Sequence, residues 1–565
     1  RIMGVVSYNN CGACSDGTGG PNDYNGHGTH VAGSVLGDGS NSPAGEDNSG
    51  MAPGAQLFMQ SVGYGNNDGS LAPPNYEDAY AEAHGAGARV HTNSWGVGPD
   101  ACGSTSSCWA YYSTDTMELD AAANNYQDLT VLFAMGNDGR DCYYTSFGSS
   151  NCPGGQDGEV NLGALNRQAT AKNILSVGAS ENLRDTLPMH ARSYYSVCGN
   201  CDWYGTPIKN DLEGDNANGM AAFSNRGPTS DGRIKPDIVA PGTWIHSTKT
   251  SLRDTGSDLG DYYTVKRGTS MATPITAGSV ALIIEHLNAH GYDCNLAYNT
   301  ASNNCPESAL VKAILSASAH DMEGQYSSGG DGQNGAVEKA PNSHEGWGRV
   351  DLERAMGSGF TEGIDITTSD SHSFKLSIPD SGITSLRVVL SWNEIENSPS
   401  AGTQLRNDLD IFLKSPTGVL QTYTNDDVNN LVGISVASPD AGDWEVIVTG
   451  ANVIDGAQKY YLAASDGVLT DMRHPVSDSY NEPGFQSGSI FTETTMTIGD
   501  DHLCAILDDS SLQCWGSNDF GQLGDGTTTD RQTMTEVSLD AARTAVSISS
   551  GRDHTCSILD NGELQ

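Results

Sequence analysis

Short apolar runs alternate with helix-like segments through the first 357 residues, and this alternation constrains the fold more than any other feature. Residues 89–94, 130–134 and 174–178 have the length and apolar character of buried strands. Residues 76–84 and 309–319 have the character of helices. Strands that alternate with helices form parallel sheets with both faces covered. We therefore predict an α/β fold with a mostly parallel sheet and helices on both faces.

A serine lies at the start of an expected buried helix in the segment Lys266-Arg-Gly-Thr-Ser-Met-Ala-Thr-Pro274. Gly268 allows close approach of the chain, and an apolar run follows Ser270. Unpaired backbone N–H groups and the positive end of the helix dipole favour developing negative charge at such a position. That environment suits both an activated hydroxyl and an oxyanion beside it. A Gly-Thr-Ser sequence alone is common in turns, so the assignment depends on other segments.

Two further segments supply the partners that such a serine needs. Asn25-Gly-His-Gly-Thr-His-Val-Ala-Gly33 offers His27 as a general base, and the expected strand at 130–134 leads to Asn137, a side-chain amide donor. With these three segments the chain resembles the subtilisin-like serine proteases, the subtilases. The resemblance implies that Ser270 is the nucleophile, that His27 is the base and that Asn137 forms an oxyanion hole with the Ser270 N–H. It implies no cofactor for catalysis.

The resemblance extends over roughly residues 1–357. Other segments similar to the family are Gly50-Met-Ala-Pro-Gly-Ala55, Thr92-Asn-Ser-Trp-Gly96, Phe223-Ser-Asn-Arg-Gly-Pro228, Lys235-Pro-Asp-Ile-Val-Ala-Pro-Gly242 and Gly346-Trp-Gly-Arg-Val350. Within the family the chain is most similar to alkaline proteases that carry a C-terminal jelly-roll β-barrel. The expected activity is therefore that of a secreted serine endopeptidase that hydrolyses peptide bonds by acyl transfer.

One member of the expected catalytic triad is missing. Subtilases carry their aspartate in an Asp-Ser/Thr-Gly motif upstream of the histidine segment, and no such motif precedes His27. Asp16 and Asp23 are the only carboxylates before His27, and both lie in loop-like sequence typical of solvated turns. Either residue would be the triad acid only if the Asp-Ser/Thr-Gly motif does not supply it. We expect the aspartate upstream of Arg1 and poor activity of these 565 residues alone.

The resemblance also places a peptide substrate. It would lie as an added strand against Ser94-Trp95-Gly96 and against Gly63-Tyr64-Gly65. The wall of the pocket for the residue before the cut would come from Gly96 and from Ala134, Met135 and Gly136. This predicts broad specificity with a preference for large apolar residues, in a pocket that Met135 narrows.

Charge and cysteine usage indicate a compartment and exclude partner classes. The chain has 70 acidic and 28 basic residues and a formal charge of −42, which disfavours nucleic acids and anionic membrane surfaces as partners. No apolar run is long enough to span a bilayer. Twelve of the thirteen cysteines form neighbouring couples, which predicts local disulfides in an extracellular protein. The couples are Cys11/Cys14, Cys102/Cys108, Cys142/Cys152, Cys198/Cys201, Cys294/Cys305 and Cys504/Cys514. A zinc site built from the two Cys-x-x-Cys couples is the alternative.

After residue 357 short strand-like runs rich in β-branched and aromatic residues follow one another, separated by turns. This pattern predicts a β-sandwich or jelly roll over residues 358–466. Its oxygen-rich loops offer a structural calcium site, with Asp408, Asp410, Asp426 and Asp427 as ligands. Two solvated turns in an acidic protein are the alternative.

The last part of the chain contains an internal repeat. Residues 467–488 are expected to be a linker, and within 489–565 the segment 499–513 recurs at 551–565 with nine of fifteen positions identical. The segment resembles the regulator-of-chromosome-condensation repeat, a unit of β-propellers. Too few units are present to close a propeller, and the sequence does not identify a partner for them. Cys556 is expected to pair beyond Gln565, or to be a reactive thiol.

Two other functions are compatible with the sequence. One is a degenerate subtilase that acts as a binding or adhesion protein through its sandwich and propeller repeats. The other is a processing protease with narrow targets. An upstream sequence without the aspartate would favour the first, and a cleavage profile would separate the second from a broad protease.

Overall fold

A computed structural model describes most of the chain and divides it into two compact units, Arg1–Gly488 and Ser489–Gln565. The described residues are 2–8, 23, 25–43, 47–63, 71, 75–98, 110–141, 158–183, 192–198, 203, 205–251, 257–294, 304–322, 339–379, 382–422, 426–471, 496–498, 502–506, 511–518, 520–539, 543–550, 554–559 and 564.

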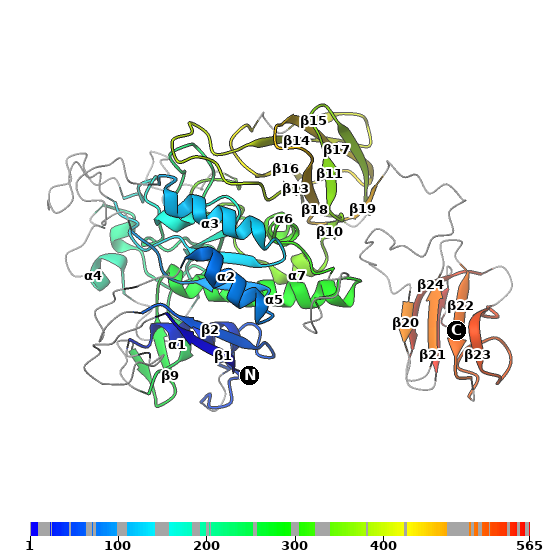
Figure 1. The fold of residues 1–565 in the computed structure, drawn as a ribbon. Helices are drawn as coiled ribbons and strands as arrows, with labels where there is room; N and C mark the ends of the chain where they lie inside the picture. The colour runs from blue at the N-terminus through cyan, green and yellow to red at the C-terminus, as the bar shows by residue number, and fades with distance from the viewer. Residues whose placement is uncertain are drawn as a thin grey trace. The chain divides into compact units, whose positions relative to one another are not determined.

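A four-stranded parallel sheet forms the centre of the α/β region, whose helices are labelled in Figure 1. Its order is β3 (Val90–Asn93), β4 (Thr130–Ala134), β5 (Leu175–Ser180) and β6 (Ile238–Pro241). Every residue of β4 and β5 is buried, as expected for central strands of a sheet covered on both faces.

Helices cover this sheet on both faces, which confirms the predicted α/β architecture. On one face, α2 (Tyr76–Gly85) and α3 (Thr114–Asn125) bury an apolar cluster with Val131 and Phe133 of β4. On the other, α5 (Thr269–Ala289) runs across β3, β4, β5 and β6, and α1 (His27–Leu36) packs beside it. The alternation of side chains along β4 lets one strand serve both layers.

A second, two-stranded parallel sheet consists of β1 (Ile2–Ser7) and β2 (Leu57–Ser61). Among the described residues, β2 pairs only with β1, and β3 pairs only with β4. The parallel strands therefore fall into two sheets, in which β2 and β3 are edge strands. A side-chain hydrogen bond of 2.8 Å between Gln60 Oε1 of β2 and His91 Nε2 of β3 connects them.

The smaller elements complete the α/β region. The helices are η3 (Arg167–Thr170), α4 (Tyr194–Cys198), η4 (Ile208–Asn210), α6 (Ser308–Ser318) and α7 (Leu352–Met356). A three-stranded antiparallel sheet consists of β7 (Ile245–Thr248), β8 (Ser257–Leu259) and β9 (Tyr263–Lys266).

An antiparallel β-sandwich follows α7, in agreement with the prediction of an all-β region. One sheet contains β10 (Gly359–Phe360), β11 (Ile364–Ile366), β13 (Ser385–Ser391), β16 (Leu431–Ala437) and β18 (Gln458–Ala464). The other contains β12 (Ser371–Ile378), β14 (Asn407–Lys414), β15 (Leu420–Thr422), β17 (Gly442–Val453) and β19 (Val468–Asp471). Alternating residues of both sheets form one apolar core that includes Trp392 and Trp444. The sheets stay open and form no closed barrel, and jelly-roll topology remains a prediction.

The second unit is a set of short antiparallel strands. They are β20 (Met496–Ile498), β21 (His502–Ile506), β22 (Leu512–Gly516), β23 (Arg531–Glu536), β24 (Ala545–Ser550) and β25 (Thr555–Leu559). Cys504 and Cys514 face each other on β21 and β22 and form the predicted disulfide.

Cysteine pairing is confirmed for one further couple, Cys294 and Cys305. Cys556 is a free thiol. The side chain of Cys198 and all of Cys11, Cys14, Cys102, Cys108, Cys142, Cys152 and Cys201 lie outside the described residues, so their pairing stays a prediction.

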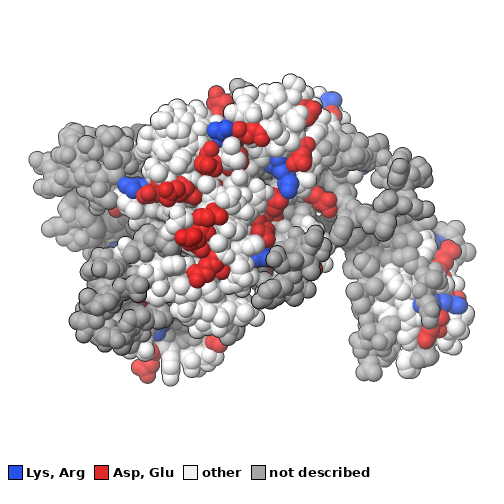
Figure 2. All heavy atoms as spheres, viewed as in Figure 1, with Lys and Arg blue, Asp and Glu red and all other residues white. Residues whose placement is uncertain are grey.

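Acidic side chains dominate the charged surface on the face shown in Figure 2. This distribution matches the formal charge of −42. Every helix among the described residues is too short or too polar to cross a membrane.

Candidate functional site

Ser270 lies in the first turn of α5. The residue before this helix is a glycine in a backbone conformation that only glycine adopts readily. Gly268 has φ +140° and precedes the helix, which starts at Thr269. Pro274 lacks the N–H that would bond to the Ser270 carbonyl inside the helix. The Ser94 hydroxyl takes that place and donates to Ser270 O at 2.8 Å, while Ser270 Oγ donates to Ser94 O at 3.2 Å. The end of β3 and the start of α5 are thus joined at the serine.

Asn137 follows β4 and faces the same helix start. Its Oδ1 accepts from Thr269 N at 2.8 Å and from Thr269 Oγ1 at 3.1 Å. Because a backbone N–H can only donate, these bonds fix the amide so that the Nδ2 group is the free donor end. The Asn137 side chain is exposed. The structure therefore brings Asn137 and Ser270 together, as the motifs predict. The N–H₂ group of the Asn137 amide is available as a donor beside the Ser270 hydroxyl.

Asn225 holds the loop that carries Asn137, and sequence reasoning missed it. The completely buried Asn225 amide donates to Met135 O at 2.9 Å and accepts from Asp138 N at 2.6 Å. Its backbone N–H donates to Gly136 O at 3.1 Å. Gly136 has φ +105°, and a Cβ there would collide with the Asn225 amide. The loop is therefore fixed on both sides of Asn137 by one residue.

His27 begins α1, and its ring makes no hydrogen bond to Ser270 within the described part of the chain. Gly26, in the left-handed region at φ 75°, precedes the helix. Desolvation by burial and then the nearby Lys266 ammonium lower the pKa of His27, and the Asp23 carboxylate acts in the opposite direction. The ring is therefore biased toward its neutral form, the state that a general base requires.

Asp23 is a helix-capping residue in this structure. Its carboxylate accepts from Gly26 N at 2.8 Å, from Thr29 N at 2.6 Å and from Thr29 Oγ1 at 2.8 Å. These bonds satisfy N–H groups at the start of α1, the usual task of a capping aspartate. They match the prediction of a turn residue. Asp16 lies outside the described residues.

The proposed pocket walls lie around a second asparagine, Asn166. A Cβ on Gly96 would lie 2.7 Å from Asn166 Nδ2, and one on Gly136 would lie 2.6 Å from Asn166 Oδ1. Asn166 thus fills the space between the two predicted walls, and only glycine fits at either position. No motif contains Asn166, so sequence reasoning did not find it.

The other predicted substrate residues occupy different environments. Trp95 stacks edge-on against Phe133 at 5.3 Å between ring centroids, and Ala134 is buried at the end of β4. The Met135 side chain is completely buried with Ala110, Leu165 and Ala169, so it does not line an open pocket in this structure. Gly63 bridges to Leu71, while Tyr64 and Gly65 lie outside the described residues.

The four predicted calcium ligands lie close enough to influence one another. Burial, followed by the charges of Asp410, Asp427 and Asp426, raises the pKa of Asp408 to about 6. Asp426, however, accepts from the N–H groups of Val428 and Asn429, as a turn residue does. Within the described ranges, no three His, Cys, Asp or Glu side chains gather as a metal site requires. Calcium binding stays a prediction.

Comparison with known proteins agrees with the motifs. The model of the subtilase family matches residues 6–348, which is more than half of the chain. Models of the regulator of chromosome condensation (RCC1) repeat match residues 494–522 and 510–558.

Three curated relatives show the range of similarity. The chain is 26% identical over 539 residues to the serine protease/ABC transporter B family protein tagB of Dictyostelium discoideum, covering 78% of this chain and 27% of the relative. It is 29% identical over 332 residues to pyrolysin of Pyrococcus furiosus, covering 54% and 20%. It is 46% identical over 71 residues to the serine protease AprX of Bacillus subtilis, covering 12% and 16%. The chain spans only about a quarter or less of the length of these relatives.

Proposed function

The chain belongs to the subtilase family of serine proteases, and from this premise we propose that it is an endopeptidase with Ser270 as nucleophile. The observation that supports this most is the junction of β3, β4 and α5. There Ser270 lies in the first turn of α5 and the Asn137 amide is fixed beside it by Thr269.

In the proposed reaction Ser270 Oγ attacks the substrate carbonyl and His27 takes its proton. The neutral bias of His27 supports its role as base. The developing oxyanion receives hydrogen bonds from Asn137 Nδ2 and from the Ser270 backbone N–H. His27 later returns the proton to the leaving amine, and water hydrolyses the acyl intermediate.

The acid that orients His27 is proposed to come from a strand outside residues 1–565. The open edges of β2 and β3 support this, because both belong to parallel sheets and their side chains meet through Gln60 and His91. The capping bonds of Asp23 argue against that residue as the acid.

We also propose an extracellular location and broad specificity. The disulfides Cys294–Cys305 and Cys504–Cys514 support an oxidising compartment. Broad specificity is supported by the predicted pocket walls Gly96 and Gly136, which carry no side chain and flank the uncharged Asn166.

Digestion of a peptide library by the full-length protein tests this function. We expect cleavage after many large apolar residues, and none by the Ser270→Ala variant. Cleavage confined to one short motif would identify a narrow processing protease. Absence of cleavage by the unmodified protein would favour a binding protein.

A further inference from the structure

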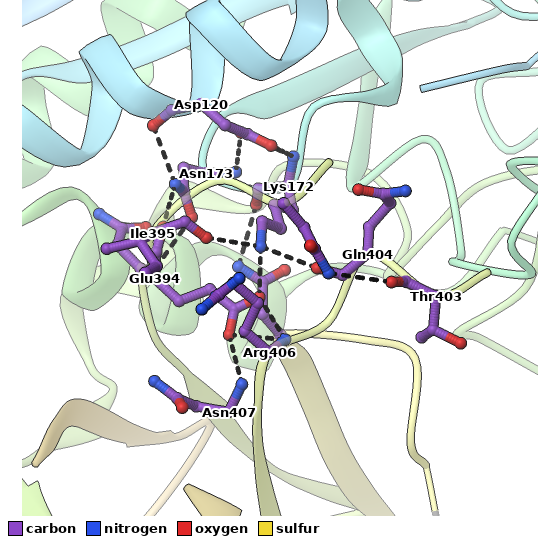
Figure 3. Close-up of polar contacts among 12 residues, drawn as sticks. Asp120, Lys172, Asn173, Glu394, Ile395, Thr403, Gln404, Arg406 and Asn407 are labelled. Carbon is purple, nitrogen blue, oxygen red and sulfur yellow. Dashed lines mark hydrogen bonds and ion pairs between the residues drawn. The ribbon is translucent and has the colours of Figure 1, made fainter. Parts of the chain in front are cut away.

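The β-sandwich and the α/β region share a buried polar interface centred on Lys172 (Figure 3). The Lys172 ammonium donates to Glu394 Oε1 at 2.6 Å, to Ile395 O at 2.8 Å and to Gln404 O at 2.9 Å. An ammonium has three donors, so all of them are used by the chain between β13 and β14. The side chains of Lys172 and Glu394 are both 0% exposed.

Glu394 is fixed from its own side as well. Its carboxylate accepts from Arg406 N at 3.1 Å and from Asn407 N at 2.8 Å. Its backbone exchanges two hydrogen bonds with the side chain of Asn173, the neighbour of Lys172. The sandwich therefore holds two consecutive residues of the α/β region at once (Figure 3).

Residues 166–173, which we call the wall segment, connect this interface to the residues predicted to wall the substrate pocket. At its far end Arg167 N donates to Val97 O at 3.0 Å, and Val97 N donates to Gln168 Oε1 at 2.9 Å. Asn166, its first residue, fills the space between Gly96 and Gly136. One end of the wall segment thus supports the cleft, and the other end is held by the sandwich.

The wall segment is short and has other fixed points inside the α/β region. Asp120 Oδ1 accepts from Lys172 N and from Asn173 N, each at 2.9 Å, and the Arg233 guanidinium donates to Thr170 O at 2.7 Å. These bonds hold the backbone, but none of them involves the Lys172 ammonium. Removing either charge of the Lys172–Glu394 pair leaves the other charge buried without its ion-pair partner, which is costly, so the wall segment would have to shift.

We propose that Lys172 and Glu394 are positioning residues through which the β-sandwich sets the wall of the substrate cleft. Neither touches substrate. Their contact fixes the wall segment, and the first residues of the wall segment contact Gly96 and Val97. This inference rests on the proposed peptidase function.

Steady-state kinetics of the full-length protein test the inference with two peptides that differ only in the residue before the cut, one large and apolar and one small. The variants are Lys172→Met, Glu394→Gln and the two combined. Lys459→Ala is the matched control, because it removes the 2.9 Å ion pair with Glu307 that joins the same two regions away from the wall segment. Melting temperatures establish a temperature at which every variant is folded.

We expect Lys172→Met to change the ratio of kcat/KM for the two peptides about 10-fold, mainly through KM, because cleft geometry and not the Ser270 chemistry is altered. The double variant should change the ratio no more than the single one, since both act through one contact. Glu394→Gln, which keeps an acceptor for Lys172, should give a smaller change in the same direction. Lys459→Ala should leave the ratio unchanged.

A purely structural role would appear as a lowered melting temperature in Lys172→Met and Glu394→Gln with an unchanged ratio, and that result would overturn the inference. If Lys172→Met does not fold, the ratio of kcat/KM measured for Glu394→Gln decides between a positioning role and a purely structural one. Failure of the proposed function is distinguishable, because the unmodified protein would then hydrolyse neither peptide.

Discussion

Hydrogen bonds join Ser270 and Asn137 to Ser94 and Thr269, whereas the His27 ring has no hydrogen-bond partner among the described residues. The nucleophile side depends on Ser94, which follows β3, and on Thr269, which begins α5. On the base side, the Asp23 carboxylate acts on His27 through its charge alone, because its hydrogen bonds go to Gly26 and Thr29. The difference shows that the described residues fix the side chains proposed as nucleophile and oxyanion donor, whereas no hydrogen bond from a described residue orients the His27 ring.

The largest expected effect comes from completing the base side. Extending the chain upstream by its natural sequence should raise turnover about 10⁴-fold, because a triad aspartate fixes the histidine tautomer and stabilises the imidazolium. Initial rates of peptide hydrolysis by the 565-residue chain and the extended chain measure this. Equal rates would mean that a residue of the present chain, Asp16 or Asp23, already serves as the acid.

On the nucleophile side, Asn137→Ala should lower kcat about 10²–10³-fold with little change in KM, the range found for removal of one oxyanion donor in subtilisin. The control is Asn41→Ala, an exposed asparagine in a turn. If kcat of Asn137→Ala stays within a factor of two of the control, the oxyanion is stabilised elsewhere.

The pKa of His27 reports on the base side directly, and its expected change between the 565-residue chain and the extended chain is a smaller effect. In the 565-residue chain it should lie below 6.5, because burial and Lys266 both disfavour the charged ring. The ring then stays neutral to lower pH, and the acid limb of kcat/KM lies below pH 6.5. In the extended chain an adjacent carboxylate should raise this pKa. NMR titration of His27 in both chains checks the direction, and a lower value in the extended chain would contradict the account.

The smallest effect concerns the sandwich. The pKa of Asp408 is raised from 3.8 to about 6, so folding favours its neutral form and stability falls as pH rises from about 4 through 6. Asp408→Asn should therefore raise the melting temperature by about 1 °C at pH 8 in EDTA, and less at pH 5.

Calcium gives the same variant a second readout. If Asp408 is a ligand, calcium should stabilise the unmodified protein at pH 8 and have little effect on Asp408→Asn. Equal calcium responses in the two proteins would remove Asp408 from the predicted site.

Elements marked by local patterns could be predicted from the sequence. Residues 130–134 form a strand as predicted, because a continuous apolar run fits only a buried position. Ser270 lies in the first turn of its helix as predicted, since a glycine turn followed by an apolar run indicates where a buried helix starts.

Contacts between distant segments could not be predicted in this way. Asn166 and Asn225 lie in loops where asparagine is common, and nothing local distinguishes a buried amide from a solvated one. Lys172 and Glu394 are 222 residues apart, and either looks like an ordinary surface charge in the sequence. Pro274 does carry a local signal for one such contact, because a proline four residues after Ser270 leaves the Ser270 carbonyl without its helical donor.

The central claim is that Ser270 is the nucleophile, and active-site labelling tests it most directly. The extended protein is treated with a serine-directed phosphonate, digested with a second protease and mapped by mass spectrometry, with Ser270→Ala treated in parallel. The account predicts one adduct, on Ser270, and none in the variant. An adduct on any other residue that persists in Ser270→Ala would contradict it.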